Sequence, residues 1–212
     1  MIVRFAAAAL LCLATSSVSA QTSPVPVVPP AASPAPQYAL VRVSLQTSEG
    51  TIVLALEKQR APVTTANFLH YVDQKKFDGI VFYRAVKVAP GYGFIQGGTR
   101  NDPKRTLPPI KHEPTSATGI HNLDGTIAMA RNAPGTAAGD FFILVGDTPS
   151  MDADPKAPGD NLGFAAFGHV VEGMDVVRHI MDAATSPTEG IGVMKGSMIA
   201  APIRIISARR VD

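Results

Sequence analysis

One arginine interrupts a run of residues that otherwise has the character of an apolar strand. Arg84 lies in the stretch VFYRAVKVAPGYGFIQGGTR, residues 81–100, where Gln96 and two glycines follow it. A guanidinium is always charged and presents five N–H donors, so it is costly among apolar neighbours unless it is hydrogen-bonded or paired. Taken alone, Arg84 is either a surface arginine whose stem lies on apolar residues or a fixed donor beside a binding site.

Other patterns that could carry chemistry are weaker. His112 and Glu113 begin an HExxH-like pattern, but Ser116 stands where the second histidine is needed and Pro114 opposes a helix, so no zinc site is expected. The aspartates between residues 147 and 160 lack the spacing of a calcium loop. The glycines of GYGFIQGG lie in strand-like sequence rather than before a helix, which argues against a phosphate loop. We also expect these histidines to be exposed or hydrogen-bonded rather than metal ligands: His121, His169 and His179.

The N-terminus indicates export. Residues 1–20 carry one early charge at Arg4, a short apolar run and a small-residue ending, which is typical of a cleavable signal peptide. The apolar run is too short for a membrane span of about twenty residues, so no stable membrane insertion is expected. Cys12 is the single cysteine of the chain and would leave with the signal. The mature protein would then have no disulfide and no thiol nucleophile.

The rest of the chain divides into a tail and one domain. Residues 21–37 are rich in proline and uncharged, which predicts an extended tail or linker. It could be a spacer, a ligand for a proline-reading module, or a disordered tail. Residues 38–212 have the size of a single domain. The formal net charge of the whole chain is only +2, and nothing in it points to nucleic acid.

The elements that would hold Arg84 in place are mostly short strands. Alternation from Leu40 onward and a glycine turn predict a hairpin over 40–57. Helical spacing predicts helices over 61–77, where Pro62 suits the first position, and over 172–183. Because the strands do not alternate regularly with helices, the pattern favours a mainly β barrel or sandwich capped by helices. Further strand-like runs are expected at 80–86, 93–98, 125–131, 141–146, 165–171 and 201–211.

A barrel suits the stretch around Arg84 best. Strict alternation over 81–86 would place Phe82, Arg84 and Val86 on one face and the residues between them on the other. Both faces would then be largely apolar, as expected where one lines a packed interior and the other forms a groove.

The motifs FYR, FIQGG, GTIAMAR, DFFILVGD and FAAFGHVVEGMDVV occur in an order and spacing that resembles the cyclophilin family of peptidyl-prolyl cis/trans isomerases, most of all its bacterial exported branch. The resemblance runs from about Leu40 to the C-terminus. It implies an eight-stranded antiparallel β-barrel closed by two α-helices, with a substrate groove on its outside.

The resemblance also implies roles for individual residues. Arg84 matches the catalytic arginine, and Gln96 matches the glutamine that borders the groove beside it. Phe142 matches the aromatic at the floor of the proline pocket. The other residues that match the substrate-binding positions are Phe94, Ala130, Arg131, Asn132 and Phe164.

Some positions depart from the family pattern. The segment VKVAPGYG between Arg84 and Gln96 is longer than usual, so Tyr92 is a further candidate for the groove, although Gly93 holds the strict register. Asp140 stands where many members have glutamine; it could pair with Arg84 or Arg131, or repel acidic substrates. The chain has no tryptophan, which many members place at the pocket rim, and we therefore predict weak binding of cyclosporin-type peptides.

The implied activity is acceleration of rotation about Xaa-Pro bonds, with Arg84 as hydrogen-bond donor to the proline nitrogen in the twisted transition state. It requires no cofactor and no metal. The expected partners are proline-containing polypeptides, above all exported or unfolded proteins, and the expected protein is a monomer in the periplasm or secreted. The alternative is a non-catalytic peptide-binding module or chaperone on the same barrel.

Overall fold

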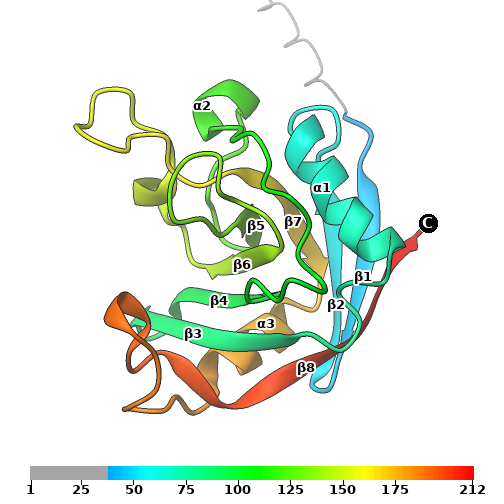
Figure 1. Ribbon diagram of the computed structural model, residues 1–212, viewed down its shortest axis with the longest axis vertical. Coiled ribbons are helices and arrows are strands. Elements are labelled where there is room, and N and C mark those ends of the chain that lie inside the picture. Colours follow the sequence, from blue (N-terminus) through cyan, green and yellow to red (C-terminus); the bar gives the residue numbers. More distant parts are fainter. Residues whose placement is uncertain (1–37) are drawn as a thin grey trace, which may run out of the picture. The chain divides into compact units, whose positions relative to one another are not determined.

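The fold is a closed barrel of eight antiparallel strands (Figure 1). The computed structural model describes residues 38–212. The strands follow one another around the barrel in the order β1-β2-β7-β5-β6-β4-β3-β8, so the first strand closes against the last. The mainly β, eight-stranded antiparallel barrel predicted from the sequence is therefore confirmed. The predicted signal peptide, 1–20, and proline-rich tail, 21–37, lie outside the described residues.

Each strand-like run of the sequence corresponds to a strand of the barrel. The strands are β1 Val41–Thr47, β2 Gly50–Leu56, β3 Val81–Ala89, β4 Tyr92–Gly98, β5 Thr126–Met129, β6 Asp140–Val145, β7 Ala166–Glu172 and β8 Met198–Val211. The helices are α1 Pro62–Asp73, α2 Thr115–Thr118 and α3 Met174–Asp182, with 3-10 turns η1 Pro149–Met151 and η2 Gly192–Met194.

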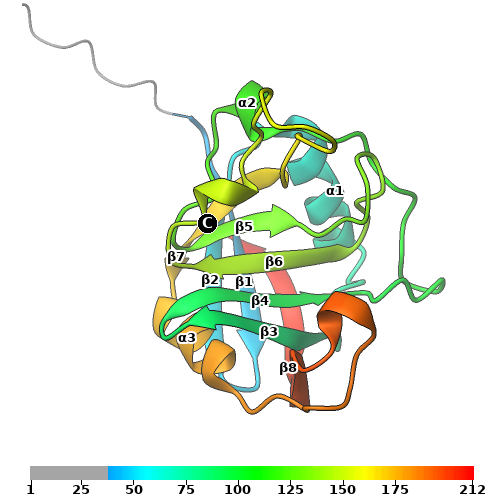
Figure 2. The same cartoon turned by 90° about the vertical axis from the view of Figure 1, so that its left-hand side faces the viewer.

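Helices α1 and α3 lie at opposite ends of the barrel (Figure 1 and Figure 2). Helix α1 begins at Pro62 as predicted but ends at Asp73, before the expected end, because the chain then turns through Lys75 with a positive φ of 54°. The single turn α2 was not predicted. No helix between residues 38 and 212 is both long and apolar enough to cross a membrane.

Aromatic side chains fill the barrel interior. Phe68 of α1 packs against Phe141 of β6 and Phe167 of β7, with ring centroids 5.3 Å apart in both pairs, and Phe82 of β3 packs edge-on against Phe141. All four side chains have 0% of their surface exposed. Because apolar burial is the main favourable contribution to folding, this cluster is expected to supply much of the stability of the barrel.

A β-bulge in β3 overturns the strict alternation expected around Arg84. Phe82 pairs with Gly97 of β4, but Arg84 pairs with Gln96, so two residues of β3 oppose one of β4. Phe82 and Ala85 both point into the core, while Tyr83 and Arg84 both line a pocket on the outside. The expectation that Phe82 and Arg84 share a face is therefore wrong, because the extra residue at 83 resets the side-chain period.

The longer segment between Arg84 and Gln96 is not a loop. Strand β3 continues to Ala89 and pairs with Tyr92 of β4 across a turn at Pro90 and Gly91. A second register shift lies between Lys87 and Ala89. The additional residues therefore lengthen a hairpin, in which Arg84 pairs with Gln96 between the two register shifts.

Candidate functional site

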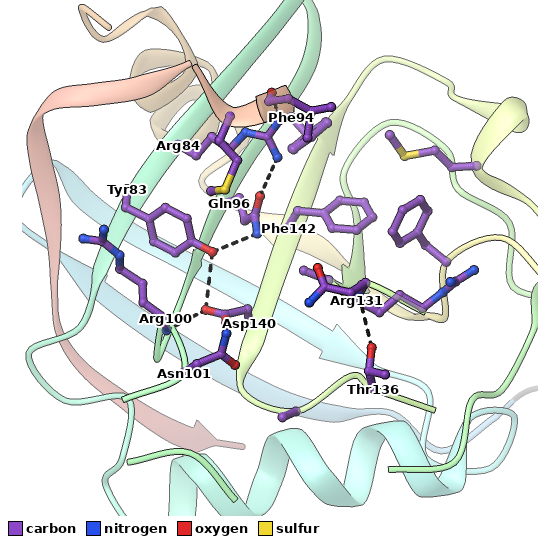
Figure 3. Close-up of a pocket in the computed structure, with 17 residues that line it drawn as sticks. Tyr83, Arg84, Phe94, Gln96, Arg100, Asn101, Arg131, Thr136, Asp140 and Phe142 are labelled. Atoms are coloured by element: carbon purple, nitrogen blue, oxygen red, sulfur yellow. Dashed lines mark hydrogen bonds between the residues drawn. The ribbon is translucent and has the colours of Figure 1, made fainter. Parts of the chain in front are cut away.

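A pocket of about 450 Å³ opens on the outer face of the barrel wall. Strands β3, β4 and β6 form its base, and the segments around residues 130–138, 151–164 and 193–194 form its rim (Figure 3). Several of its side chains belong to a small apolar cluster that is separate from the barrel core, so the pocket has its own packed floor. Of the nine predicted site residues, the structure brings eight to this pocket: Arg84, Phe94, Gln96, Ala130, Arg131, Asn132, Phe142 and Phe164.

Arg84 is held at the pocket wall by three hydrogen bonds. Its Nε donates to Ser197 Oγ at 2.9 Å, Nη1 donates to Gln96 Oε1 at 3.0 Å, and Nη2 donates to the carbonyl of Val193 at 2.9 Å. Its burial lowers the pKa of Arg84 from the ordinary value, but an arginine keeps its charge in proteins. Three of its five N–H groups are thus occupied, and one on each terminal nitrogen remains for a ligand.

The floor of the pocket is aromatic. Phe142 packs against Phe94 with ring centroids 5.2 Å apart and against Phe164 at 5.3 Å. The Arg84 guanidinium lies 5.5 Å from the centroid of the Phe94 ring, within range of a cation–π attraction. An apolar ring on this floor would therefore lie beside a charged N–H donor.

Arg131 lines the pocket, but its guanidinium is engaged by other parts of the protein. Its side chain is 5% exposed, donates from Nε to the Gly163 carbonyl at 2.9 Å, and forms a two-pronged ion pair with Asp160. Its guanidinium lies 5.2 Å from the centroid of the Phe164 ring. Arg131 thus fixes the segment that carries Phe164, and Ala130 and Asn132 line the open side of the pocket.

Tyr92 does not line the pocket. Its ring lies over Gly146, where an added Cβ would come within 2.5 Å of the Tyr92 Cδ2 atom. The extra residues of the β3–β4 hairpin are absorbed in strand pairing, so they do not shift Tyr92 toward Arg84. The structure does not support the inclusion of Tyr92 among the groove residues.

Asp140 pairs with neither Arg84 nor Arg131. Its Oδ1 accepts from the backbone N–H of Arg100 at 2.9 Å and from the Tyr83 hydroxyl at 3.4 Å. Burial raises the pKa of Asp140, and the hydrogen bonds from Arg100 and Tyr83 oppose this rise. Of the two alternatives, pairing of Asp140 with an arginine side chain is therefore not found, because the bulge in β3 brings Tyr83 into that space.

Sequence reasoning missed three residues that act on the site. Strict alternation places Tyr83 on the opposite face from Arg84, although its hydroxyl accepts from Gln96 Nε2 at 2.8 Å. Ser197 and Val193 hold Arg84 from a segment more than a hundred residues away. No local period or motif connects that segment to Arg84, so only the closed barrel reveals the contact.

The site combines the charged guanidinium of Arg84, held by three hydrogen bonds, with an apolar floor. Within residues 38–212, no three His, Cys, Asp or Glu side chains gather where they could hold a metal ion. The arrangement is suited to holding a compact apolar ring while offering it a charged hydrogen-bond donor.

Comparison with known proteins identifies a similar family. The model of the family described as "Cyclophilin type peptidyl-prolyl cis-trans isomerase/CLD" matches residues 42–209. The chain is 38% identical over 170 residues to "Peptidyl-prolyl cis-trans isomerase A" of Dickeya dadantii, which covers 79% of this chain and 83% of that protein. It is 40% identical over 151 residues to "Peptidyl-prolyl cis-trans isomerase cyp18" of Streptomyces antibioticus, and this match covers 70% of this chain and 87% of that protein.

Solved structures show the same fold. A crystal structure of a cyclophilin type peptidyl-prolyl cis-trans isomerase of Cryptosporidium parvum matches with a TM-score of 0.64 at 18% identity, over 82% of this chain and 99% of that one. A second crystal structure of that protein, in the presence of the dipeptide Ala-Pro, matches with a TM-score of 0.63 at 19% identity, over 81% and 99%.

Proposed function

The chain belongs to the cyclophilin-type peptidyl-prolyl cis-trans isomerase family and is an enzyme of that class, and from this premise we propose that Arg84 catalyses rotation about Xaa-Pro bonds by donating to the proline nitrogen. The observation that carries the proposal is the placement of Arg84: two of its N–H groups remain free of protein partners at the edge of an aromatic floor.

The chemistry of the peptide bond explains why a donor helps. Rotation costs about 18 to 20 kcal/mol because the nitrogen shares its lone pair with the carbonyl. In the twisted state that sharing ends, the nitrogen becomes pyramidal, and its lone pair can accept a hydrogen bond. The hydrogen bond from Arg84 to the proline nitrogen therefore forms in the twisted transition state and hardly at all in the planar ground state. An interaction that is stronger in the transition state lowers the barrier to rotation.

The pocket supplies the rest of the acceleration. A rate increase of about 10⁵ requires roughly 7 kcal/mol, more than one charged hydrogen bond of about 1.5 to 3 kcal/mol provides. Phe94 and Phe142 would hold the proline ring on the floor, while Gln96 and the backbone near Ala130 would hold the flanking peptide. The residue before proline is then free to rotate. The Ala-Pro dipeptide present with the Cryptosporidium parvum protein supports a proline-containing substrate.

One assay tests the role of Arg84. We expect Arg84→Ala to lower the rate of cis/trans exchange in an Ala-Pro peptide by about a hundredfold or more, since removing one preorganised donor typically costs 10² to 10³, while the variant unfolds at nearly the wild-type denaturant concentration. Arg178→Ala is the matched control, because that exposed arginine pairs with Asp124 and neither residue lines the pocket.

Two outcomes would contradict the proposal. An Arg84→Ala variant with wild-type exchange rates would exclude the arginine mechanism. A wild-type protein without exchange above background would favour the alternative of a peptide-binding module or chaperone that uses the same groove.

We further propose that the enzyme works on exported proteins, as a monomer in the periplasm or outside the cell. The N-terminal segment 1–20 supports this, since its short apolar run and small-residue ending are typical of a cleaved signal. Spontaneous Xaa-Pro isomerisation takes tens of seconds or more, slow enough to limit folding. Mass spectrometry of the mature N-terminus tests the export: a chain that retains Met1 and Arg4 would contradict it.

A further inference from the structure

Three side chains of the pocket wall form a chain of hydrogen bonds that ends on Arg84 (Figure 3). Asp140 Oδ1 accepts from the Tyr83 hydroxyl at 3.4 Å, and the Tyr83 oxygen accepts from Gln96 Nε2 at 2.8 Å. We propose that Tyr83 and Asp140 are positioning residues for the isomerisation, because they fix the orientation of the Gln96 amide and thereby the direction in which Arg84 donates. This inference rests on the role of Arg84 proposed above.

The direction of each hydrogen bond follows from the first. Asp140 Oδ1 already accepts from the backbone N–H of Arg100, so it acts as the acceptor and the Tyr83 hydroxyl donates the hydrogen bond between them. The Tyr83 oxygen is then left as an acceptor, and it takes the N–H of Gln96. With its nitrogen held by Tyr83, the Gln96 amide presents its oxygen to Arg84 at 3.0 Å. A reversed amide would direct N–H groups at a guanidinium that has no acceptor.

Asp140 lies in a space that the fold keeps open for it. Gly98 of β4 has a φ of +142°, and a Cβ there would lie 2.3 Å from Asp140 Oδ1. The backbone N–H of Arg100 donates to the same oxygen at 2.9 Å, so the carboxylate is anchored independently of Tyr83. An anchored acceptor can orient a hydroxyl, whereas a freely rotating one cannot.

Tyr83 is suited to a fixed position in this chain. Its side chain is 4% exposed, and the guanidinium of Arg100 lies 5.2 Å from the centroid of its ring. Burial and the neighbouring carboxylate raise the pKa of Tyr83 above its ordinary value, so the hydroxyl keeps the proton that it donates. The unequal lengths of its two hydrogen bonds, 2.8 Å to Gln96 and 3.4 Å to Asp140, predict that Tyr83 has the larger effect on Arg84.

The test separates positioning from mere support of the fold. We expect Tyr83→Phe, which keeps the ring, to lower kcat for an Ala-Pro peptide about tenfold with KM changed less than twofold, since tenfold corresponds to about 1.4 kcal/mol, the size of one net hydrogen bond. Asp140→Ala should lower kcat about threefold. Asp140→Asn should stay within about twofold of the wild type, because its amide oxygen still accepts from Arg100 and Tyr83.

A double-mutant cycle shows whether the effect passes through Arg84. In an Arg84→Ala background, adding Tyr83→Phe should change the exchange rate less than twofold, since there is no donor left to orient. Tyr71→Phe is the control for the loss of a buried hydroxyl: Tyr71 of α1 accepts from the Leu107 N–H at 2.7 Å outside the pocket, and its variant should retain the wild-type kcat.

The outcomes distinguish this proposal from the one on which it rests. If Arg84→Ala loses the rate but Tyr83→Phe and Asp140→Ala retain kcat, the positioning role is wrong and the arginine mechanism stands. A Tyr83→Phe loss that persists fully in the Arg84→Ala background, or that falls on KM alone, also overturns positioning. If Arg84→Ala itself keeps the wild-type rate, the arginine mechanism fails first.

Discussion

Two neighbouring phenylalanines of β6 point to opposite sides of the barrel wall. Phe141 faces the interior, where its ring centroid lies 5.3 Å from that of Phe68 and 5.5 Å from that of Phe77. Phe142 faces the pocket and contacts Phe94 and Phe164. Both are almost fully buried, at 0% and 3% exposed. They differ in that Phe141 packs only against interior rings, whereas Phe142 lines the pocket in which a ligand would lie. We therefore expect one residue type to serve stability in one place and activity in the other.

The largest effect is expected from truncation inside the barrel. Phe141→Ala would leave a cavity among aromatic rings that cannot collapse into it, and such changes cost about 3 to 5 kcal/mol of unfolding free energy. Urea denaturation measures the loss. A loss below about 1 kcal/mol would mean that the interior cluster is not what holds the barrel together.

Truncation on the pocket side should have a smaller effect on stability and a clear one on activity. We expect Phe142→Ala to lower kcat/KM about ten- to a hundredfold, equivalent to the roughly 1.5 to 3 kcal/mol that a buried phenylalanine side chain contributes. Its unfolding free energy should fall less than that of Phe141→Ala, because the space opens toward solvent. Equal stability losses for the two variants would contradict the comparison.

A smaller effect is expected from the ion pair behind Phe164. Asp160→Ala would release Arg131, whose guanidinium lies under the Phe164 ring. We expect KM for an Ala-Pro peptide to rise about two- to fivefold with kcat nearly unchanged, a change of at most about 1 kcal/mol in binding. An unchanged KM would show that the neighbouring rings hold Phe164 without this support.

The smallest effect is expected at the surface, outside both aromatic clusters. Arg209 lowers the pKa of Asp78 below its ordinary value. A carboxyl whose pKa is lowered by folding contributes its full stabilisation above its unfolded pKa of about 3.9. That stabilisation is lost as the pH falls through the folded-state pKa. Asp78→Asn should therefore cost less than about 1 kcal/mol at pH 7 and a smaller amount at about pH 2, which denaturation at the two pH values measures. A greater cost at the lower pH would contradict this sign.

Much of the fold could be predicted from residue types and spacing, and the site residues from the resemblance to the cyclophilin family. The alternation of short strands and the proline at the start of α1 are local signals, and the barrel confirms them. The matched motifs located Arg84, Gln96 and Phe142, which the structure brings to one pocket.

The remaining features depend on contacts that no local pattern encodes. The bulge at Tyr83 follows from how β3 pairs with β4, not from the order of apolar and polar residues in β3. The sequence leaves Arg84 and Arg131 as possible partners of Asp140, and only the folded strands show that its carboxylate instead accepts from Tyr83 and from the backbone N–H of Arg100. The hold of Ser197 on Arg84 likewise requires β8 to close the barrel beside β3.

Because of the bulge, the number of residues in β3 determines which of its side chains face the pocket. Phe82 and Ala85 point inward on either side of two outward residues, Tyr83 and Arg84. Deleting either outward residue would restore simple alternation and leave the interior filled, whereas deleting Phe82 would move the following side chains to the wrong side. We therefore expect deletion of Tyr83 or Arg84 to reduce activity more than stability, and deletion of Phe82 to disrupt the fold. A barrel of this kind can therefore acquire or discard a functional group by insertion or deletion, without any change to the residues that build its core.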